Sequence, residues 1–482
     1  MIGINTEKYL NDDIIARSVA DPGNTDRLKE LFRNAKSGEK LTIAFLGGSI
    51  TQGCLSSTPE LCYAYLVYDW FVRTFPKASF KYVNAGIGGT TSQFAAARLE
   101  EDLLAYRPDF CMVEFSVNDS DNVFFKETYE SVVSRILETK TQPAVMILHN
   151  LFYEDGRNAQ KQHLEVGKAY GIPCVSVRDA VYPEIKEGRI RISQLSSDGL
   201  HPNDDGHAVL ATLVCDRLEK ILIESESRSD DNDWEKNSES EDSSRINNDA
   251  ANIESGTTKY RRITLDAYCT VRRFQNMDKG VLCKGFVPDN TPKENMLDIF
   301  KRGWKASKAG DEIEFTFTGT ELGIQYRKTI RRPAPVAVAI IDGDEEHPVV
   351  LDANFDQDWG DSLHIDTLLY HGHRVDPSAM YGDFETISDF KPISVSEPYY
   401  GRVNQNSRMH ETQKNDADNR NQNQSGTNGC DQNRNGANGC DQNQKGLELA
   451  CMPPVTHKVT IRIIETHEND MEVFYLVSFI AG

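Results

Sequence analysis

Five short apolar runs, separated by segments with helical spacing, constrain the first half of the chain more than any other feature. The runs are 41–47 (LTIAFLG), 80–85 (FKYVNA), 109–115 (DFCMVEF), 143–149 (PAVMILH) and 172–177 (IPCVSV). Segments such as 61–75, 125–139 and 205–223 carry apolar residues at three- and four-residue intervals, as amphipathic helices do. This alternation predicts an α/β domain in which helices cover both faces of a parallel sheet.

The character of the sequence changes at Glu224. Residues 224–256 are mostly Asp, Glu, Ser and Asn, and we predict an acidic flexible linker there because the segment has almost nothing to bury. Beyond it, apolar and polar residues alternate in short segments at 312–318, 321–326, 335–342, 348–351 and 457–465. Regular short strands predict an antiparallel β-sandwich. The expected order is an N-terminal extension (1–39), the α/β domain (40–223), the linker and a sandwich domain (257–482).

A low-complexity tract interrupts the sandwich pattern at about 404–446. It is rich in Asn, Gln, Asp and Gly, and its segments 428–433 and 438–443 are near-duplicates. We predict a disordered insertion, because such a composition cannot offset the entropy of ordering by burial. Metal binding by Cys430 and Cys440 is the alternative, although two thiols in a loose loop are poorly preorganised.

Charge and composition exclude several classes of partner. The net charge of −21 argues against nucleic acid or an anionic membrane surface, which would repel the chain. The first residues lack a basic region followed by an apolar run, and no segment approaches a membrane span in length. We therefore expect a cytoplasmic protein, in which the ten cysteines remain free thiols. No spacing indicates a zinc site, and we expect neither metal nor cofactor.

Polar residues follow three of the apolar runs. Ser49 follows the first run in LGGSITQG, the glycines of NAGIGGTTS follow the second, and Asn118 follows the third in VEFSVND. Open α/β sheets bind ligands at the carboxyl ends of their strands. Each segment alone is also an ordinary turn, but their occurrence at successive strand ends of one sheet favours a site.

A fourth segment, DGLHPNDDGH, brings Asp198 and His201 into one short loop. Serine is a weak nucleophile, and a histidine can take its proton and later deliver it to a leaving alcohol, while an aspartate orients the imidazole. An amide such as that of Asn118 and a glycine N–H are suitable donors to a developing oxyanion. Alternatively, Asp198 caps the next helix and His201 is an exposed loop residue.

These four segments resemble the ordered blocks of the SGNH/GDSL hydrolase superfamily, over about residues 40–222. The resemblance implies a flavodoxin-like, three-layer α/β/α fold. It also implies Ser49 as nucleophile and oxyanion donor, Gly89 and Asn118 as further oxyanion donors, and His201 as base with Asp198 as its orienter.

The chain departs from the family pattern at two positions. Gly48 precedes the serine where the family usually has aspartate, and Ser116 opens the third block where the family usually has glycine. Neither departure removes a catalytic atom. Among the glycines of the second block, register with the threonines that follow favours Gly89 over Gly86 and Gly88.

The pairing with a sandwich is similar to bacterial carbohydrate esterases, in particular the mannan acetylesterases of carbohydrate esterase family 17, whose sandwich resembles a carbohydrate-binding module. This implies a serine esterase, a carboxylic ester hydrolase, that removes O-acetyl groups from mannan- or xylan-derived oligosaccharides. Trp304 and Trp359 are candidates to stack on a sugar ring, or else core aromatics of the sandwich. Two alternatives stay open: a lipid or thioester acylhydrolase of the GDSL type, and a carbohydrate-binding protein with an inert hydrolase domain.

Overall fold

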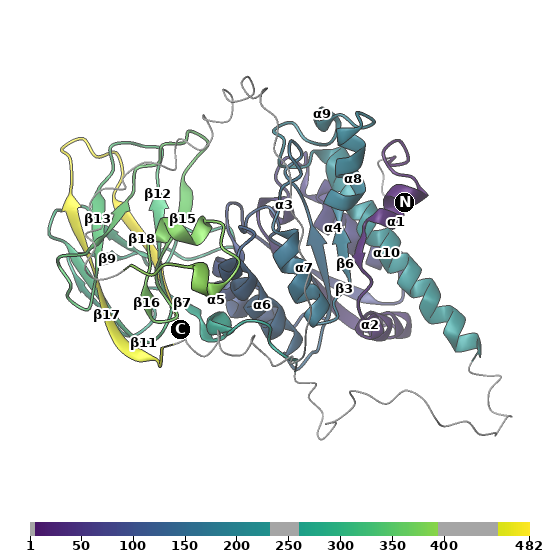
Figure 1. Ribbon diagram of the computed structural model, residues 1–482, viewed down its shortest axis with the longest axis horizontal. Helices are drawn as coiled ribbons and strands as arrows, with labels where there is room; N and C mark the ends of the chain where they lie inside the picture. Colours follow the sequence, from purple (N-terminus) through teal and green to yellow (C-terminus); the bar gives the residue numbers. More distant parts are fainter. Residues whose placement is uncertain (1–4, 232–259, 394–451) are drawn as a thin grey trace, which may run out of the picture.

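The computed structural model describes residues 5–231, 260–393 and 452–482. Within these ranges the chain forms an α/β domain and a β-sandwich that pack side by side (Figure 1). The greater part of the predicted linker and the whole of the predicted Asn/Gln-rich insertion lie outside the described residues. No helix in the described ranges is long and apolar enough to cross a membrane.

The first domain is built on a six-stranded sheet with the order β1-β6-β5-β4-β2-β3. Five strands run parallel: β2 (Lys40–Gly47), β3 (Ser79–Gly86), β4 (Phe110–Glu114), β5 (Ala144–His149) and β6 (Cys174–Ser176). The sixth, β1 (Val19–Asp21), is an antiparallel edge strand. The order of the five parallel strands is that of a flavodoxin-like sheet, so the predicted fold class is confirmed.

Helices cover both faces of this sheet. In β2, Ile43 and Phe45 contribute to one buried cluster and Ala44 and Leu46 to another, because successive side chains of a strand point to opposite faces. The first face is covered by α1 (Asp12–Arg17), α2 (Asp26–Ser37), α4 (Tyr63–Thr74), α8 (Val177–Lys186) and α10 (Asp204–Asp231). The second is covered by α5 (Ser92–Asp102), α6 (Val123–Leu137) and α7 (Gln160–Ala169).

Both ends of this domain extend beyond the predicted boundaries. The predicted N-terminal extension supplies β1 to the sheet and α2 to its cover, and Phe32 of α2 is 1% exposed. At the other end α10 continues to Asp231, past the predicted boundary at 224. Glutamate and serine tolerate a helix although they bury nothing, and Glu226 pairs with Lys36 of α2 at 2.5 Å.

The second domain is a sandwich of two antiparallel sheets. One has the order β16-β15-β12-β18-β10-β9, with β7 also paired to β18, and the other has the order β14-β13-β17-β11-β8. The strands are β7 (Arg272–Phe274), β8 (Val281–Lys284), β9 (Val287–Pro288), β10 (Trp304–Ala306), β11 (Glu312–Gly319), β12 (Leu322–Lys328), β13 (Val336–Ile341), β14 (Val349–Asp352), β15 (Ser362–Tyr370), β16 (His373–Arg374), β17 (Val455–Glu465) and β18 (Phe474–Ala481). The predicted sandwich is therefore confirmed.

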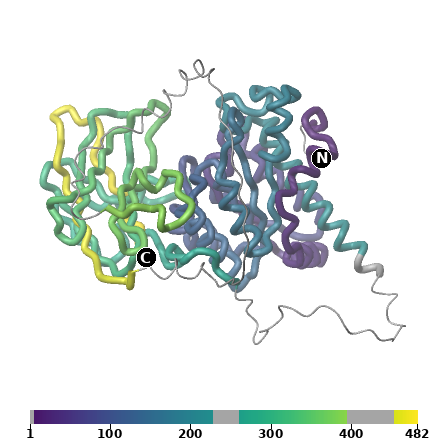
Figure 2. The backbone as a smooth tube through the Cα atoms, viewed as in Figure 1, coloured from purple at the N-terminus to yellow at the C-terminus, as the bar shows by residue number. Residues whose placement is uncertain are grey.

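The sheet that contains β18 packs against α5 and α6. Phe94 and Phe124 of these helices share one buried cluster with Ile365, Tyr370 and Ile480 of the sandwich. The backbone trace shows the segment that contains the 3₁₀ helix η5 (Pro377–Tyr381) lying beside the α/β domain (Figure 2). The two domains are therefore joined by a packed interface as well as by the chain between them.

Candidate active site

Ser49 stands at the sharp turn between β2 and α3 (Ser49–Gln52). A Cβ atom at Gly47 would lie 2.1 Å from Thr51 Oγ1, and one at Gly86 would lie 2.3 Å from the backbone nitrogen of Gln52. Both distances are far below van der Waals contact, so only glycine fits at these two positions. The turn therefore lies directly on the carboxyl ends of β2 and β3, where open α/β sheets bind ligands.

A continuous chain of hydrogen bonds joins three of the predicted site residues. His201 Nε2 lies 2.9 Å from Ser49 Oγ, and His201 Nδ1 lies 2.7 Å from Asp198 Oδ2. The other oxygen of Asp198 accepts hydrogen bonds from the backbone N–H groups of Leu200 (2.9 Å) and His201 (2.8 Å). The loop thus holds the carboxylate, which in turn orients the imidazole toward the serine. This arrangement can accept a proton from Ser49 when the hydroxyl attacks an electrophile.

The local environment shifts the pKa values of both ionisable groups of this loop. Burial raises the pKa of Asp198, but hydrogen bonds from His201 and Leu200 outweigh it and lower the pKa to about 2. Burial lowers the pKa of His201, but the contacts with Cys54 and Asp198 outweigh it and raise the pKa to about 9. The aspartate is therefore ionised at neutral pH, and the imidazolium is stabilised beside it.

Among the three candidate glycines at the end of β3 and after it, one has a free backbone donor. The N–H of Gly86 donates to Asn84 Oδ1 (2.9 Å), and that of Gly88 donates to Gln52 Oε1 (2.6 Å). Gly89 is exposed, has a φ of 67° and has no acceptor for its N–H among the described residues. Of the three candidate glycines, Gly89 alone can offer its N–H to a ligand.

The Asn118 side chain lies against the backbone of Gly48. A Cβ atom at Gly48 would come within 2.2 Å of Asn118 Oδ1 and 2.9 Å of its Cγ. In this chain the asparagine amide occupies the space that a side chain at position 48 would need. Asn118 is thus held next to Ser49, at the end of β4.

Two nearby residues were not assigned a role from the sequence. His207 is fully buried, its Nδ1 accepts from Tyr63 N–H (3.3 Å) and its Nε2–H donates to the Cys54 carbonyl (3.1 Å). Burial lowers the pKa of His207 to about 4, so the ring is neutral and fixes the backbone at Cys54. The Cys54 side chain in turn contacts His201. The only feature of the sequence that could have indicated a role for Cys54 is its position shortly after Ser49.

The two tryptophans predicted to bind sugar differ in accessibility. Trp304 is 1% exposed and packs against Phe479 at a centroid distance of 5.7 Å. A sugar ring cannot reach it, and it is a core residue of the sandwich. Trp359 is 63% exposed and contacts Phe355 edge-on at 5.2 Å, so its ring has a free face.

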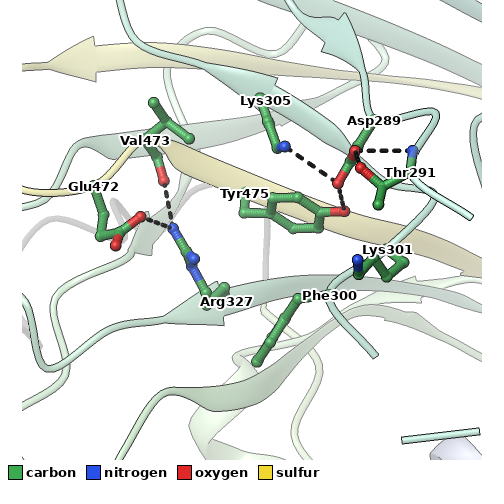
Figure 3. A pocket seen from close by; sticks show the side chains of 9 residues that line it. All are labelled: Asp289, Thr291, Phe300, Lys301, Lys305, Arg327, Glu472, Val473 and Tyr475. Atoms are coloured by element: carbon green, nitrogen blue, oxygen red, sulfur yellow. Dashed lines mark hydrogen bonds and ion pairs between the residues drawn. The ribbon is translucent and has the colours of Figure 1, made fainter. Parts of the chain in front are cut away.

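Two cavities lie away from Ser49. One of about 340 Å³ opens on the sandwich, and its charged groups are largely paired with each other (Figure 3): Asp289 accepts from Tyr475, and Arg327 pairs with Glu472. The other, of about 390 Å³, lies at the seam between the domains beside Phe384. The described ranges hold no cluster of three potential metal-ligating side chains.

Comparison with known proteins gives consistent matches. Residues 45–209 match the model of the GDSL-like lipase/acylhydrolase family. An acetylxylan esterase of Geobacillus stearothermophilus is 31% identical over 204 residues, which are 36% of this chain and 91% of the relative. The thioesterase 1/protease 1/lysophospholipase L1 of Escherichia coli strain K12 is 25% identical over 189 residues, 38% of this chain and 85% of the relative.

One similarity extends over both domains. The crystal structure of a two-domain esterase active on acetylated mannans, co-crystallised with mannopentaose, is 39% identical in sequence and superposes with a TM-score of 0.72. The match covers 97% of each chain. A second crystal structure of a two-domain esterase active on acetylated mannans gives the same identity and TM-score.

Proposed function

This chain belongs to the GDSL-like lipase/acylhydrolase family and is a carboxylic ester hydrolase, and we propose that it removes O-acetyl groups from mannan-derived oligosaccharides. The observation that carries the proposal is the hydrogen-bonded chain from Ser49 through His201 to Asp198. The similarity of both domains to an esterase active on acetylated mannans supports this choice of substrate.

In the proposed reaction, Ser49 Oγ attacks the acetyl carbonyl carbon while His201 Nε2 takes the hydroxyl proton. The resulting oxyanion accepts hydrogen bonds from the N–H groups of Ser49 and Gly89 and from the Asn118 amide. The C–O bond to the sugar then breaks, and His201 returns its proton to the sugar oxygen. An acetyl-serine remains on the enzyme.

A water molecule completes the cycle. It attacks the acetyl-serine carbonyl as His201 takes one of its protons. The second tetrahedral intermediate then collapses to acetic acid while His201 returns this proton to Ser49 Oγ, and the acetic acid ionises in solvent. Throughout both steps Asp198 stays ionised and holds the imidazole in one tautomer, which its lowered pKa allows. No residue beyond those of the site is needed to balance the protons.

We also propose that the sandwich contributes to oligosaccharide binding through Trp359. Its ring has a free face, and its loop contains the carboxylates of Asp356 and Asp358, which suit the C–H face and the hydroxyl groups of a pyranose.

Acetate release from a substrate panel tests the proposal. Purified protein is incubated with acetylated manno-oligosaccharides, acetylated xylo-oligosaccharides, a long-chain ester and a long-chain acyl thioester. Release that is fastest from the manno-oligosaccharides supports the proposed function. Turnover confined to the long-chain substrates would instead identify a lipid or thioester acylhydrolase, and no turnover of any substrate would favour a binding protein.

A further inference from the structure

The loop that carries Asn118 is held at its far end by the sandwich. Asn122, four positions later, is fully buried, and its Nδ2 donates to the carbonyls of Met380 (3.0 Å) and Gly382 (2.8 Å). The next residue, Val123, donates its N–H to the Phe384 carbonyl (3.3 Å). One segment of the sandwich domain, residues 380–384, therefore accepts a row of hydrogen bonds from the start of α6.

The loop that carries Gly89 has a similar anchor. It runs directly into α5, whose second residue is the buried Gln93. Gln93 Nε2 donates to Thr367 Oγ1 in β15 (2.7 Å) and to the hydroxyl of Tyr268 (3.2 Å). Both acceptors belong to the C-terminal half of the chain and are themselves buried.

A buried carboxylate links the two loops to each other. Asp119 directly follows Asn118, and its Oδ1 accepts from the N–H of Ser92, the first residue of α5 (2.9 Å). Its Oδ2 lies 3.0 Å from Nε2 of His163 in α7, and both side chains are almost completely inaccessible. A movement of either loop would break a buried, charge-assisted hydrogen bond, so the two loops are held as one unit.

We propose that the sandwich positions the oxyanion hole. It holds the Asn118 loop through Asn122 and the Gly89 loop through Gln93, and Asp119 couples the two. This role is additional to any contact with sugar, so it acts even on an ester too small to reach the sandwich. The inference rests on the proposed function, because it assumes that Asn118 and Gly89 are the oxyanion donors.

The mechanism fixes which kinetic constant should change. Donors to an oxyanion act in the transition state, so their displacement lowers kcat and leaves KM for a small ester nearly unchanged. Removal of one donor costs about 100- to 1000-fold in kcat. Loosening the loop that carries a donor is a milder change, for which we expect a fall of about tenfold.

Two substitutions weaken the anchors with little other change. Asn122→Ser keeps an oxygen that can cap α6, where Asn122 Oδ1 accepts from Phe125 N–H (3.0 Å), and removes the amide that binds the sandwich. Thr367→Val keeps the shape of its side chain and removes the acceptor for Gln93. The matched control is Thr318→Val. Among the described residues, the Thr318 side chain bonds only that of another exposed threonine, Thr456 (2.9 Å), in the sheet that faces away from the α/β domain.

The variants are compared with the wild-type chain on 4-nitrophenyl acetate, and their thermal unfolding is measured in parallel. We expect kcat to fall about tenfold in Asn122→Ser and by a smaller factor in Thr367→Val, with KM unchanged and with no effect of Thr318→Val. Wild-type kcat in both interface variants would overturn the inference. If Asn122→Ser does not fold, Thr367→Val alone decides.

A double-mutant cycle separates positioning from general weakening of the fold. If Asn122 acts through Asn118, the substitution Asn122→Ser should have no further effect on kcat in an Asn118→Ala background. The same fold-change in both backgrounds would overturn the inference. Ser49→Ala distinguishes the two proposals: full turnover in that variant refutes the proposed function, whereas Ser49-dependent turnover with unaffected interface variants refutes only the positioning role.

Discussion

Substitution of Gly48 by alanine should lower both activity and stability. The backbone at Gly48 has a φ of −90° and a ψ of −147°, which lie outside the regions that alanine adopts without strain. The new Cβ atom would stand 2.2 Å from Asn118 Oδ1, more than 1 Å inside normal carbon–oxygen contact, so the amide must move by about that distance. The three nearest atoms belong to the end of one side chain, which can rotate, so the backbone strain adds most of the cost, and we expect a loss of about 2–3 kcal/mol in unfolding free energy.

The displaced amide should also slow catalysis. A misplacement of about 1 Å in a group that acts on the transition state costs on the order of a hundredfold, or about 2.7 kcal/mol in activation free energy. We therefore expect kcat on 4-nitrophenyl acetate to fall about a hundredfold in Gly48→Ala, close to the fall in Asn118→Ala. The double variant should be no slower than the slower single variant, because both changes remove the same interaction.

Gly343→Ala is the control, because it should lower stability without a change in activity. Gly343 has a φ of 77° and open space around it, so alanine there should cost about 1 kcal/mol in unfolding free energy and leave kcat unchanged. Wild-type kcat in a folded Gly48→Ala protein would refute the reasoning, because it would mean that the amide of Asn118 either does not move or does not act on the reaction.

The remaining predictions concern the base and the tryptophans. Neutral His201 is the active form and its pKa is raised to about 9, so kcat/KM should rise about a hundredfold between pH 7 and the plateau above pH 9; a flat profile over this range would contradict the assignment. The same raised pKa stabilises the fold below pH 6.5, and this contribution is lost as the pH rises through about 9. Trp304→Ala should lower the unfolding free energy by about 3–5 kcal/mol, as measured by denaturant titration. Trp359→Ala should leave stability unchanged and raise KM for acetylated manno-oligosaccharides but not for 4-nitrophenyl acetate; an equal effect on both esters would argue against sugar binding.

The α/β sheet could be predicted because its strands are short apolar runs at regular intervals. Several strands of the sandwich were not predicted, and the buried strand β18 shows why. All eight residues of β18 are buried, since one face packs in the sandwich core and the other against α5 and α6. Its sequence FYLVSFIA therefore lacks the alternation on which the other sandwich strands were identified.

The local part of the site was also accessible from the sequence. Ser49 and Asn118 each lie in a compact segment that follows a strand, and parallel topology brings such ends to one edge of the sheet. Asp198 and His201 share one short loop before α10. The contacts that support these residues could not be predicted from the sequence. Asp119 contacts His163 across 44 positions, and Gln93 contacts Thr367 across 274, and no local pattern encodes such pairings.

The most direct test of the central claim is to trap the acyl intermediate. The wild-type protein and Ser49→Ala are mixed with acetylated mannotriose, quenched in acid within the first turnover and digested for mass spectrometry. The proposed mechanism predicts one acetyl group on the wild-type peptide that contains Ser49 and none in the variant, which should also release no acetate. Acetate release by Ser49→Ala at the wild-type rate would contradict the mechanism.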